Sequence, residues 1–212
     1  MSPIFKASTF ILLTPDGKVL LTLRKKSLKF LGGFHVYPGG RVDDEDYNSI
    51  LSGRVSLELL KNLSSLAFMS EREMIAHIVA GIREVFEETG IFLGSDRGNL
   101  NVVERYRKGL LTFDDVVKEC DISVPENIMY LDHWLTPPVF PVRFDTRFFL
   151  VKLEGEPEVF PNPREIEEYI WIRPEDAITR AERNQIKLMP PTYVTLKKVK
   201  KILAEKSDTR IT

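Results

Sequence analysis

Three glutamates within one short segment form the clearest chemical feature of this sequence. Glu84, Glu87 and Glu88 occupy positions i, i+3 and i+4, so on an α-helix their carboxylates gather on one side of about one turn. Like charges at that spacing repel one another unless a cation or a basic side chain neutralises them. Because hard cations such as Mg²⁺ or Mn²⁺ prefer oxygen ligands, the spacing predicts a divalent metal site. The competing interpretation is a solvated acidic face that ends at a C-capping glycine, Gly90.

Apolar residues at helical period predict the orientation of the helix that carries these glutamates. They form one stripe, which consists of Met74, Ile75, Ile78, Val79, Ile82, Val85 and Phe86. At about 100° per residue the carboxylates fall nearly opposite this stripe. We therefore expect a helix over residues 70–89 that buries the stripe and exposes the carboxylates. Gly81 inside this helix costs roughly 1 kcal/mol relative to Ala, so we expect another stretch of backbone to pass close to it.

A glycine pair upstream supplies a second feature. The segment Tyr37-Pro38-Gly39-Gly40 predicts a tight turn, because glycine adopts backbone angles that other residues resist. Such a turn leaves bare backbone that can approach a metal or a phosphate. Joined to the REVFEETG helix at residues 83–90, it resembles the signature of the Nudix hydrolases. The resemblance implies an α/β fold of the Nudix α/β/α-sandwich type, with a mixed sheet.

The same resemblance implies roles for the signature residues. Glu84, Glu87, Glu88 and the Gly40 carbonyl would hold Mg²⁺ or Mn²⁺, and Arg83 would brace the loop through an acidic partner. Asp46 stands where most of the family carries a glutamate, and Asp43, Asp44 and Glu45 are rival partners for Arg83. An insertion at about residues 47–72 then precedes the helix. Its apolar content predicts one or two short helices, either as a structural cap or as one wall of a substrate site.

A basic stretch precedes the glycine pair. Residues 20–40 read LLTLRKKSLKFLGGFHVYPGG, which resembles the motif of the Nudix coenzyme A diphosphatases. This resemblance implies that Arg24 and Lys29, with the backbone of Gly39 and Gly40, bind the charged nucleotide end of the substrate. The alternative is an ordinary strand that runs into a solvated basic loop. Later segments at 132–137, 141–149 and 188–192 resemble the same branch of the family.

The implied activity is hydrolysis of the pyrophosphate in a nucleoside diphosphate-X substrate, in first place coenzyme A or acyl-coenzyme A. The products would be 3′,5′-ADP and a phosphopantetheine-type compound. The base that activates the attacking water is either Glu84 or a later glutamate, Glu165, Glu167 or Glu168. Two alternatives stay open, namely an ADP-ribose or dinucleotide diphosphatase and a non-catalytic Nudix-fold ligand sensor.

Composition is typical of a single domain over residues 1–212 with elaborations. The 212 residues are 43% hydrophobic and 29% charged, which is enough to bury a good core. The net charge of −1 argues against a dedicated nucleic-acid binder, and a single cysteine, Cys120, excludes an internal disulfide. No signal pattern or bilayer-length apolar run is present. We therefore expect a cytoplasmic enzyme with a small-molecule nucleotide substrate, no membrane or nucleic-acid partner, and the capacity to form a homodimer.

The elements that position these residues follow from local patterns. Segments rich in β-branched and aromatic residues predict strands over 7–13, 19–23, 129–135, 146–153 and 169–172. Thr14-Pro15-Asp16-Gly17 predicts a turn that joins the first two strands as a hairpin. Helices are expected over 70–89, 112–120, 174–183 and 192–205.

Overall fold

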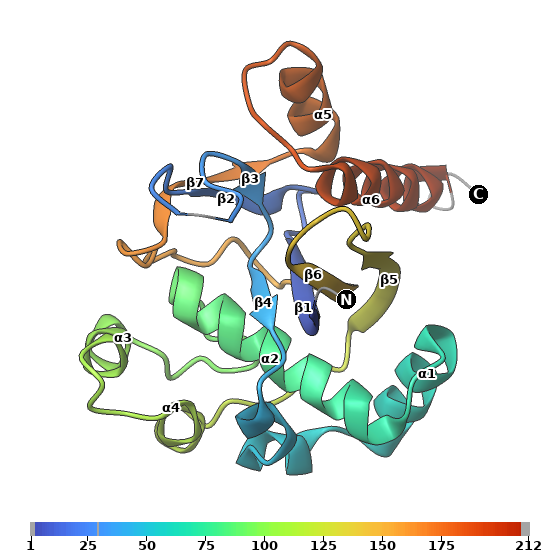
Figure 1. Cartoon of the computed structure of the whole chain (residues 1–212). Helices are drawn as coiled ribbons and strands as arrows, with labels where there is room; N and C mark the ends of the chain where they lie inside the picture. Colours follow the sequence, from blue (N-terminus) through green and yellow to red (C-terminus); the bar gives the residue numbers. More distant parts are fainter. Residues whose placement is uncertain (1–2, 29, 209–212) are drawn as a thin grey trace.

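A mixed β-sheet forms the centre of the molecule, and helices cover both of its faces (Figure 1). The computed structural model describes residues 3–28 and 30–208, with side chains as far as Glu205. The strands are β1 (Ile4–Leu13), β2 (Val19–Arg24), β3 (His35–Val36), β4 (Gly39–Arg41), β5 (Ile128–Leu135), β6 (Arg143–Lys152) and β7 (Ile166–Ile172). The α-helices are α1 (Leu57–Ala67), α2 (Glu71–Thr89), α3 (Leu100–Arg107), α4 (Phe113–Glu119), α5 (Pro174–Glu182) and α6 (Pro190–Asp208). The expected α/β class with a mixed sheet is confirmed.

The sheet splits at one end, and this split positions the glycine pair. Its main path runs β3-β2-β1-β6-β5, while β4 also pairs with β1 and β7 with β2. The two hairpin strands β1 and β2 are in register at Leu13 and Val19. Farther along, Ala7 to Thr9 of β1 pair with β4, whereas β2 pairs with β3 and β7. The diverging strands therefore place β4 beside β1, close to α2.

Alternate residues of β1 and β2 face two separate cores. Phe10, Leu12 and Leu20 pack in the core that includes α2, whereas Ile11 and Leu21 pack in the core that includes α6. This alternation is the period-two pattern of a strand that is covered on both faces. The two long helices therefore lie on opposite faces of the sheet, as Figure 1 also shows.

Helix α2 agrees with its prediction in extent but not in exposure. The Ser70 side chain accepts a hydrogen bond from the Glu73 amide at the N-terminus, and Gly90 with φ 69° caps the C-terminus. The expected exposure of its carboxylate side is wrong, because His77, Ala80 and Glu88 on that side are buried. Other elements of the chain cover this side of the helix.

The close neighbour of Gly81 is a side chain and not the expected backbone. A Cβ atom at Gly81 would lie 2.0 Å from Cε1 of Phe10 in β1. The glycine therefore lets the Phe10 ring pack directly against the backbone of α2, which explains why a residue with low helix propensity stands there.

The insertion folds as the expected short helices. Two 3₁₀ helices, η1 (Asp44–Tyr47) and η2 (Ile50–Arg54), lead into α1. Leu51, Leu60 and Leu63 are buried in the core that contains α2, so the insertion serves as a structural cap. Its outer surface exposes two large apolar side chains, Leu57 and Phe68, among charged ones such as Glu58 and Lys61.

Other predictions were met within a few residues, and three elements were missed. Helix α3 and the short strands β3 and β4 were not predicted. The two strands were missed because a strand of two or three residues carries no periodic signal. The tight turn predicted at residues 37–40 is wrong, since Gly39 and Gly40 form β4 and neither has a positive φ. Across the described residues, no helix combines the length and apolar character that crossing a membrane requires.

Candidate active site

The three glutamates occupy the last two turns of α2 and are largely enclosed. The side chains of Glu84, Glu87 and Glu88 keep 15%, 25% and 3% of their surface exposed. We call this group the carboxylate turn. Burial of three nearby acids is unfavourable unless each has a donor or a counter-ion, so the partners of each carboxylate define what the site can do.

Glycines at β4 allow the sheet to approach the carboxylate turn. A Cβ atom at Gly40 would lie 2.4 Å from the Glu84 carboxylate, and one at Gly39 would lie 2.5 Å from the Ser8 carbonyl oxygen. The Gly39 backbone N–H also stabilises the charged form of Glu88. Glycine is therefore needed at both positions because the Glu84 carboxylate and the Ser8 backbone lie too close to leave room for a Cβ atom. Left-handed backbone angles are not the reason.

Arg83 connects the carboxylate turn to the loop after β4. Its Nε and one terminal nitrogen donate to the two carboxylate oxygens of Asp46 at 2.8 and 2.9 Å, and it also donates to the Arg41 carbonyl at 2.9 Å. This bidentate pair confirms that Arg83 braces the loop through an acidic partner. Of the rival acids, Asp43 lies farther from the Arg83 guanidinium, at 3.8 Å, so Asp46 is the principal acidic partner of Arg83.

Glu87 is held by two donors from different elements. Arg83 donates to its Oε2 at 3.1 Å and to Glu84 Oε1 at 2.9 Å. The hydroxyl of Tyr106 in α3 donates to Glu87 Oε1. Tyr106 was not among the predicted site residues, since a single sequence gives no signal that links α3 to the carboxylate turn. Both oxygens of Glu87 are thus already hydrogen-bonded, which fixes the orientation of this carboxylate.

Glu88 has one ion pair and one unsatisfied oxygen. Arg24 of β2 lies 3.3 Å from its Oε1, whereas its Oε2 is buried and has no hydrogen-bond partner. Burial and the neighbouring Glu84 raise the pKa of Glu88 well above its ordinary value. An unpaired buried carboxylate oxygen beside a second acid is a position that a cation would stabilise.

The pKa of Glu84 is also raised, to about 7. Burial is the main cause, Arg83 opposes it, and the charges of Glu87 and Glu165 add to it. Two carboxyl groups with raised pKa values on one turn are common at functional sites. Within residues 3–28 and 30–208, however, no three acidic, histidine or cysteine side chains converge closely enough to enclose an ion as they stand.

Among the later glutamates, Glu165 lies nearest to the site. It is 3.9 Å from Arg24, and its charge raises the pKa values of Glu84 and Glu88. Glu168, the expected catalytic residue from this segment, is exposed on β7, and its charge acts instead on His35. The structure therefore places Glu165, and not Glu168, beside the carboxylate turn.

The predicted substrate-binding residues have different positions. Arg24 is bound to Glu88 and reaches Glu165, so it is already neutralised by acids of the site. Gly39 and Gly40 lie against the carboxylate turn. Lys29 lies outside the described residues.

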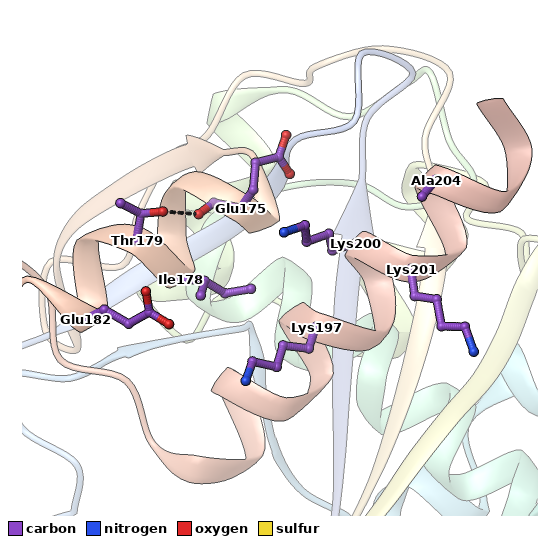
Figure 2. Close-up of a pocket in the computed structure, with 8 residues that line it drawn as sticks. All are labelled: Glu175, Ile178, Thr179, Glu182, Lys197, Lys200, Lys201 and Ala204. Carbon is purple, nitrogen blue, oxygen red and sulfur yellow. Dashed lines mark hydrogen bonds between the residues drawn. The ribbon is translucent and has the colours of Figure 1, made fainter. Parts of the chain in front are cut away.

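Figure 2 shows a separate open groove between α5 and α6. Glutamates of α5, Glu175 and Glu182, and lysines of α6, Lys197 and Lys200, line it. It belongs to the face of the sheet that α6 covers, whereas the carboxylate turn belongs to the α2 face. The groove holds none of the predicted site residues.

Comparison with known proteins supports a relationship over nearly the whole chain. Residues 8–199 match the family described as the NUDT19 Nudix domain. The acyl-coenzyme A diphosphatase NUDT19 of Xenopus laevis is 26% identical over 88% of this chain and 60% of the relative. Putative nudix hydrolase 7 of Caenorhabditis elegans is 26% identical over 92% of this chain and 60% of the relative. The chain thus spans 60% of the length of these relatives.

A solved structure gives the same result for the fold. The crystal structure of a NUDIX hydrolase from Alicyclobacillus acidocaldarius superposes with a TM-score of 0.73 at 25% identity, covering 94% of this chain and 92% of that one. This superposition confirms the fold type expected from the sequence.

Proposed function

The chain belongs to the NUDT19 Nudix domain family, and from this premise we propose that it hydrolyses the pyrophosphate of coenzyme A or acyl-coenzyme A. The products are 3′,5′-ADP and the corresponding phosphopantetheine compound. The observation that carries the proposal is the buried carboxylate turn, in which Glu84 and Glu88 have raised pKa values and Glu88 keeps an unpaired oxygen. Relatives with the name acyl-coenzyme A diphosphatase support the substrate.

A divalent cation, Mg²⁺ or Mn²⁺, fits the chemistry of this turn. Glu84, Glu87, Glu88 and the Gly40 carbonyl would hold it, because they offer only oxygen ligands and an excess of negative charge. When bound, such an ion screens the charge of a pyrophosphate and lowers the pKa of a coordinated water. The unpaired Glu88 oxygen supports this assignment independently of any relative.

The residues of the chain orient the carboxylates and supply the base. Arg83 and Tyr106 fix Glu87, and Arg24 holds Glu88. Glu84 and Glu165 are the two candidates to accept a proton from water. We favour Glu84, because it lies within the carboxylate turn itself, whereas Glu165 contacts the turn through Arg24.

A hydrolysis panel tests the proposal. Purified protein is incubated with Mg²⁺ or Mn²⁺ and with coenzyme A, acyl-coenzyme A, ADP-ribose, NADH or diadenosine polyphosphates, and products are separated by chromatography. We expect metal-dependent release of 3′,5′-ADP, and we expect Glu87→Gln to lower kcat by about a hundredfold or more. Preference for ADP-ribose over coenzyme A would mean that ADP-ribose, and not coenzyme A, is the substrate. Absence of hydrolysis of every compound would favour a ligand sensor.

Arg24 allows a finer test of substrate recognition. If Arg24 acts mainly on Glu88, Arg24→Ala should reduce kcat/KM for coenzyme A and for its analogue without the 3′-phosphate by similar factors. A loss at least tenfold larger for coenzyme A would instead assign Arg24 to the 3′-phosphate, since a charged hydrogen bond contributes roughly 1.5–3 kcal/mol.

The cytoplasmic location and the homodimer expected from the sequence also stay proposals. Cell fractionation tests the location, and light scattering tests the oligomeric state.

A further inference from the structure

A short loop at residues 160–165, directly before β7, is attached to the C-terminal end of α2. The Phe160 amide donates to the Thr89 carbonyl at 2.7 Å, and the Asn162 amide donates to the Glu88 carbonyl at 2.8 Å. Carbonyl groups in the last turn of a helix have no partner within the helix. The loop therefore supplies donors that the end of α2 needs, and we call it the capping loop.

The backbone of the capping loop determines where Glu165 lies. The Glu165 amide donates to the Asn162 carbonyl at 3.1 Å, and the Glu165 carbonyl accepts from the Lys25 amide at 2.9 Å. The Glu165 carboxylate is 3.9 Å from Arg24, the residue that also pairs with Glu88. The loop thus places an acid beside the carboxylate turn without any direct bond between Glu165 and the three glutamates.

Arg107, at the last position of α3, contacts the capping loop from outside. One terminal nitrogen of its half-buried guanidinium donates to the Phe160 carbonyl, whereas its Nε is buried and has no hydrogen-bond partner. Burial lowers the pKa of Arg107, and no acid of the described residues opposes this shift. Burial of a cation without a counter-ion is unfavourable, so this arrangement needs an explanation other than packing.

We propose that Arg107 is a positioning residue of the active site, which holds the capping loop against the end of α2 and so keeps Glu165 beside Glu88. The inference rests on the proposed function. Its basis is a continuous series of contacts from Arg107 through Phe160 and the loop backbone to Glu165. A hydrogen bond from a charged donor is roughly twice as strong as a neutral one, which explains why a cation occupies this place.

Amide hydrogen exchange, measured by NMR on the metal-free protein in EDTA, tests the contact without turnover. Arg107→Met keeps most of the apolar stem and removes the donor and the charge. We expect the amides of Phe160 and Asn162 to exchange about tenfold faster or more than in wild type, because the bond to the charged donor is lost. Unchanged exchange at both amides would overturn the inference.

Arg105→Met is the matched control for this measurement. It makes the same chemical change in the same helix, but Arg105 pairs with Glu119 of α4 at 2.7 Å and not with the capping loop. Exchange at Phe160 and Asn162 should stay within about twofold of wild type. Circular dichroism verifies that both variants fold.

Steady-state kinetics test whether the position of the loop matters for hydrolysis. Arg107→Met should lower kcat about tenfold and change KM by less than about twofold, because displacement of a catalytic group by about 1 Å can cost up to about a hundredfold while the substrate loses no contact. In a Glu165→Gln background the same substitution should lower kcat by less than about twofold, since Arg107 acts through Glu165. Asn162→Ala, which removes the acceptor of the Arg164 amide within the loop, should reproduce the loss of kcat.

The outcomes separate this inference from the proposed function. A tenfold rise in KM at constant kcat would mean that Arg107 contacts the substrate, and an equal loss of kcat in both backgrounds would mean that it does not act through Glu165; either result overturns the inference alone. If wild type hydrolyses no compound of the panel while Arg107→Met still speeds exchange at Phe160 and Asn162, the proposed function fails and the positioning of the capping loop by Arg107 is supported.

Discussion

The raised pKa of Glu84 predicts that the metal-free protein loses stability as the pH rises. The folded state holds the Glu84 proton with a pKa of about 7, against 4.5 as the ordinary value. The stability contributed by this proton is fully present below pH 4.5 and is lost as the pH rises through 7. The difference, 7 − 4.5, at about 1.36 kcal/mol per unit gives about 3 kcal/mol in total. Only 15% of the Glu84 side chain is exposed, so solvent screening removes little of it.

The assay is urea unfolding in EDTA from pH 5 to pH 8.5, with wild type and Glu84→Gln in parallel. The glutamine variant cannot titrate at this position. Between pH 5 and pH 8.5 the free energy of unfolding of wild type should therefore fall by about 2.5 kcal/mol more than that of the variant. His77 titrates in both proteins, and the comparison removes most of its effect. Glu84→Gln also removes the charge that helps to raise the pKa of Glu88, so the measured difference belongs to Glu84 together with its effect on Glu88. His77, whose pKa burial lowers, acts in the opposite direction, because its stability is lost as the pH falls.

Glu71→Gln is a matched control, since it makes the same chemical change at an exposed position of the same helix. It should leave the pH dependence parallel to that of wild type. If the difference between the free energies of unfolding of wild type and Glu84→Gln instead changes by less than about 0.5 kcal/mol from pH 5 to pH 8.5, Glu84 does not release a proton in this range. The electrostatic description of the carboxylate turn is then refuted.

Three further predictions concern the groups that support the turn. Tyr106→Phe keeps the ring against Phe86 but removes the hydrogen bond to Glu87, and a loss of about tenfold in kcat with a raised requirement for Mg²⁺ is expected from steady-state kinetics; an unchanged metal dependence would make Tyr106 a packing residue only. Asp46→Leu leaves the Arg83 guanidinium without its bidentate partner, so urea unfolding should show a loss of about 3 kcal/mol, and a loss below 1 kcal/mol would contradict the bracing role. Gly40→Ala places a Cβ atom against Glu84, which should abolish activity while circular dichroism stays native; full activity would mean that β4 is free to move away.

The sequence alone determined the elements that repeat a pattern over many residues. Helix α2 was predicted to within a residue at each end, because its apolar stripe and the C-capping Gly90 specify its extent. The long strands β1, β2, β5 and β6 and the helical insertion followed in the same way. Types and spacing within residues 83–90 were sufficient to locate the acidic turn, and the chemistry that they predict for it stays a prediction.

The tertiary structure decided which partners the acids have, and periodicity could not supply this. The carboxylate side of α2 is polar in sequence, so exposure was expected, but β4 and α3 cover it with backbone and one phenol. These contacts join residues that are far apart in the chain, such as Arg24 with Glu88 and Arg83 with Asp46. A short strand such as β4 has no period of its own, and its position depends on the divergence of β1 from β2. Burial, and hence the raised pKa of Glu84 and the unpaired oxygen of Glu88, is therefore a property of the packed sheet and helices, because only packing removes water from the acids.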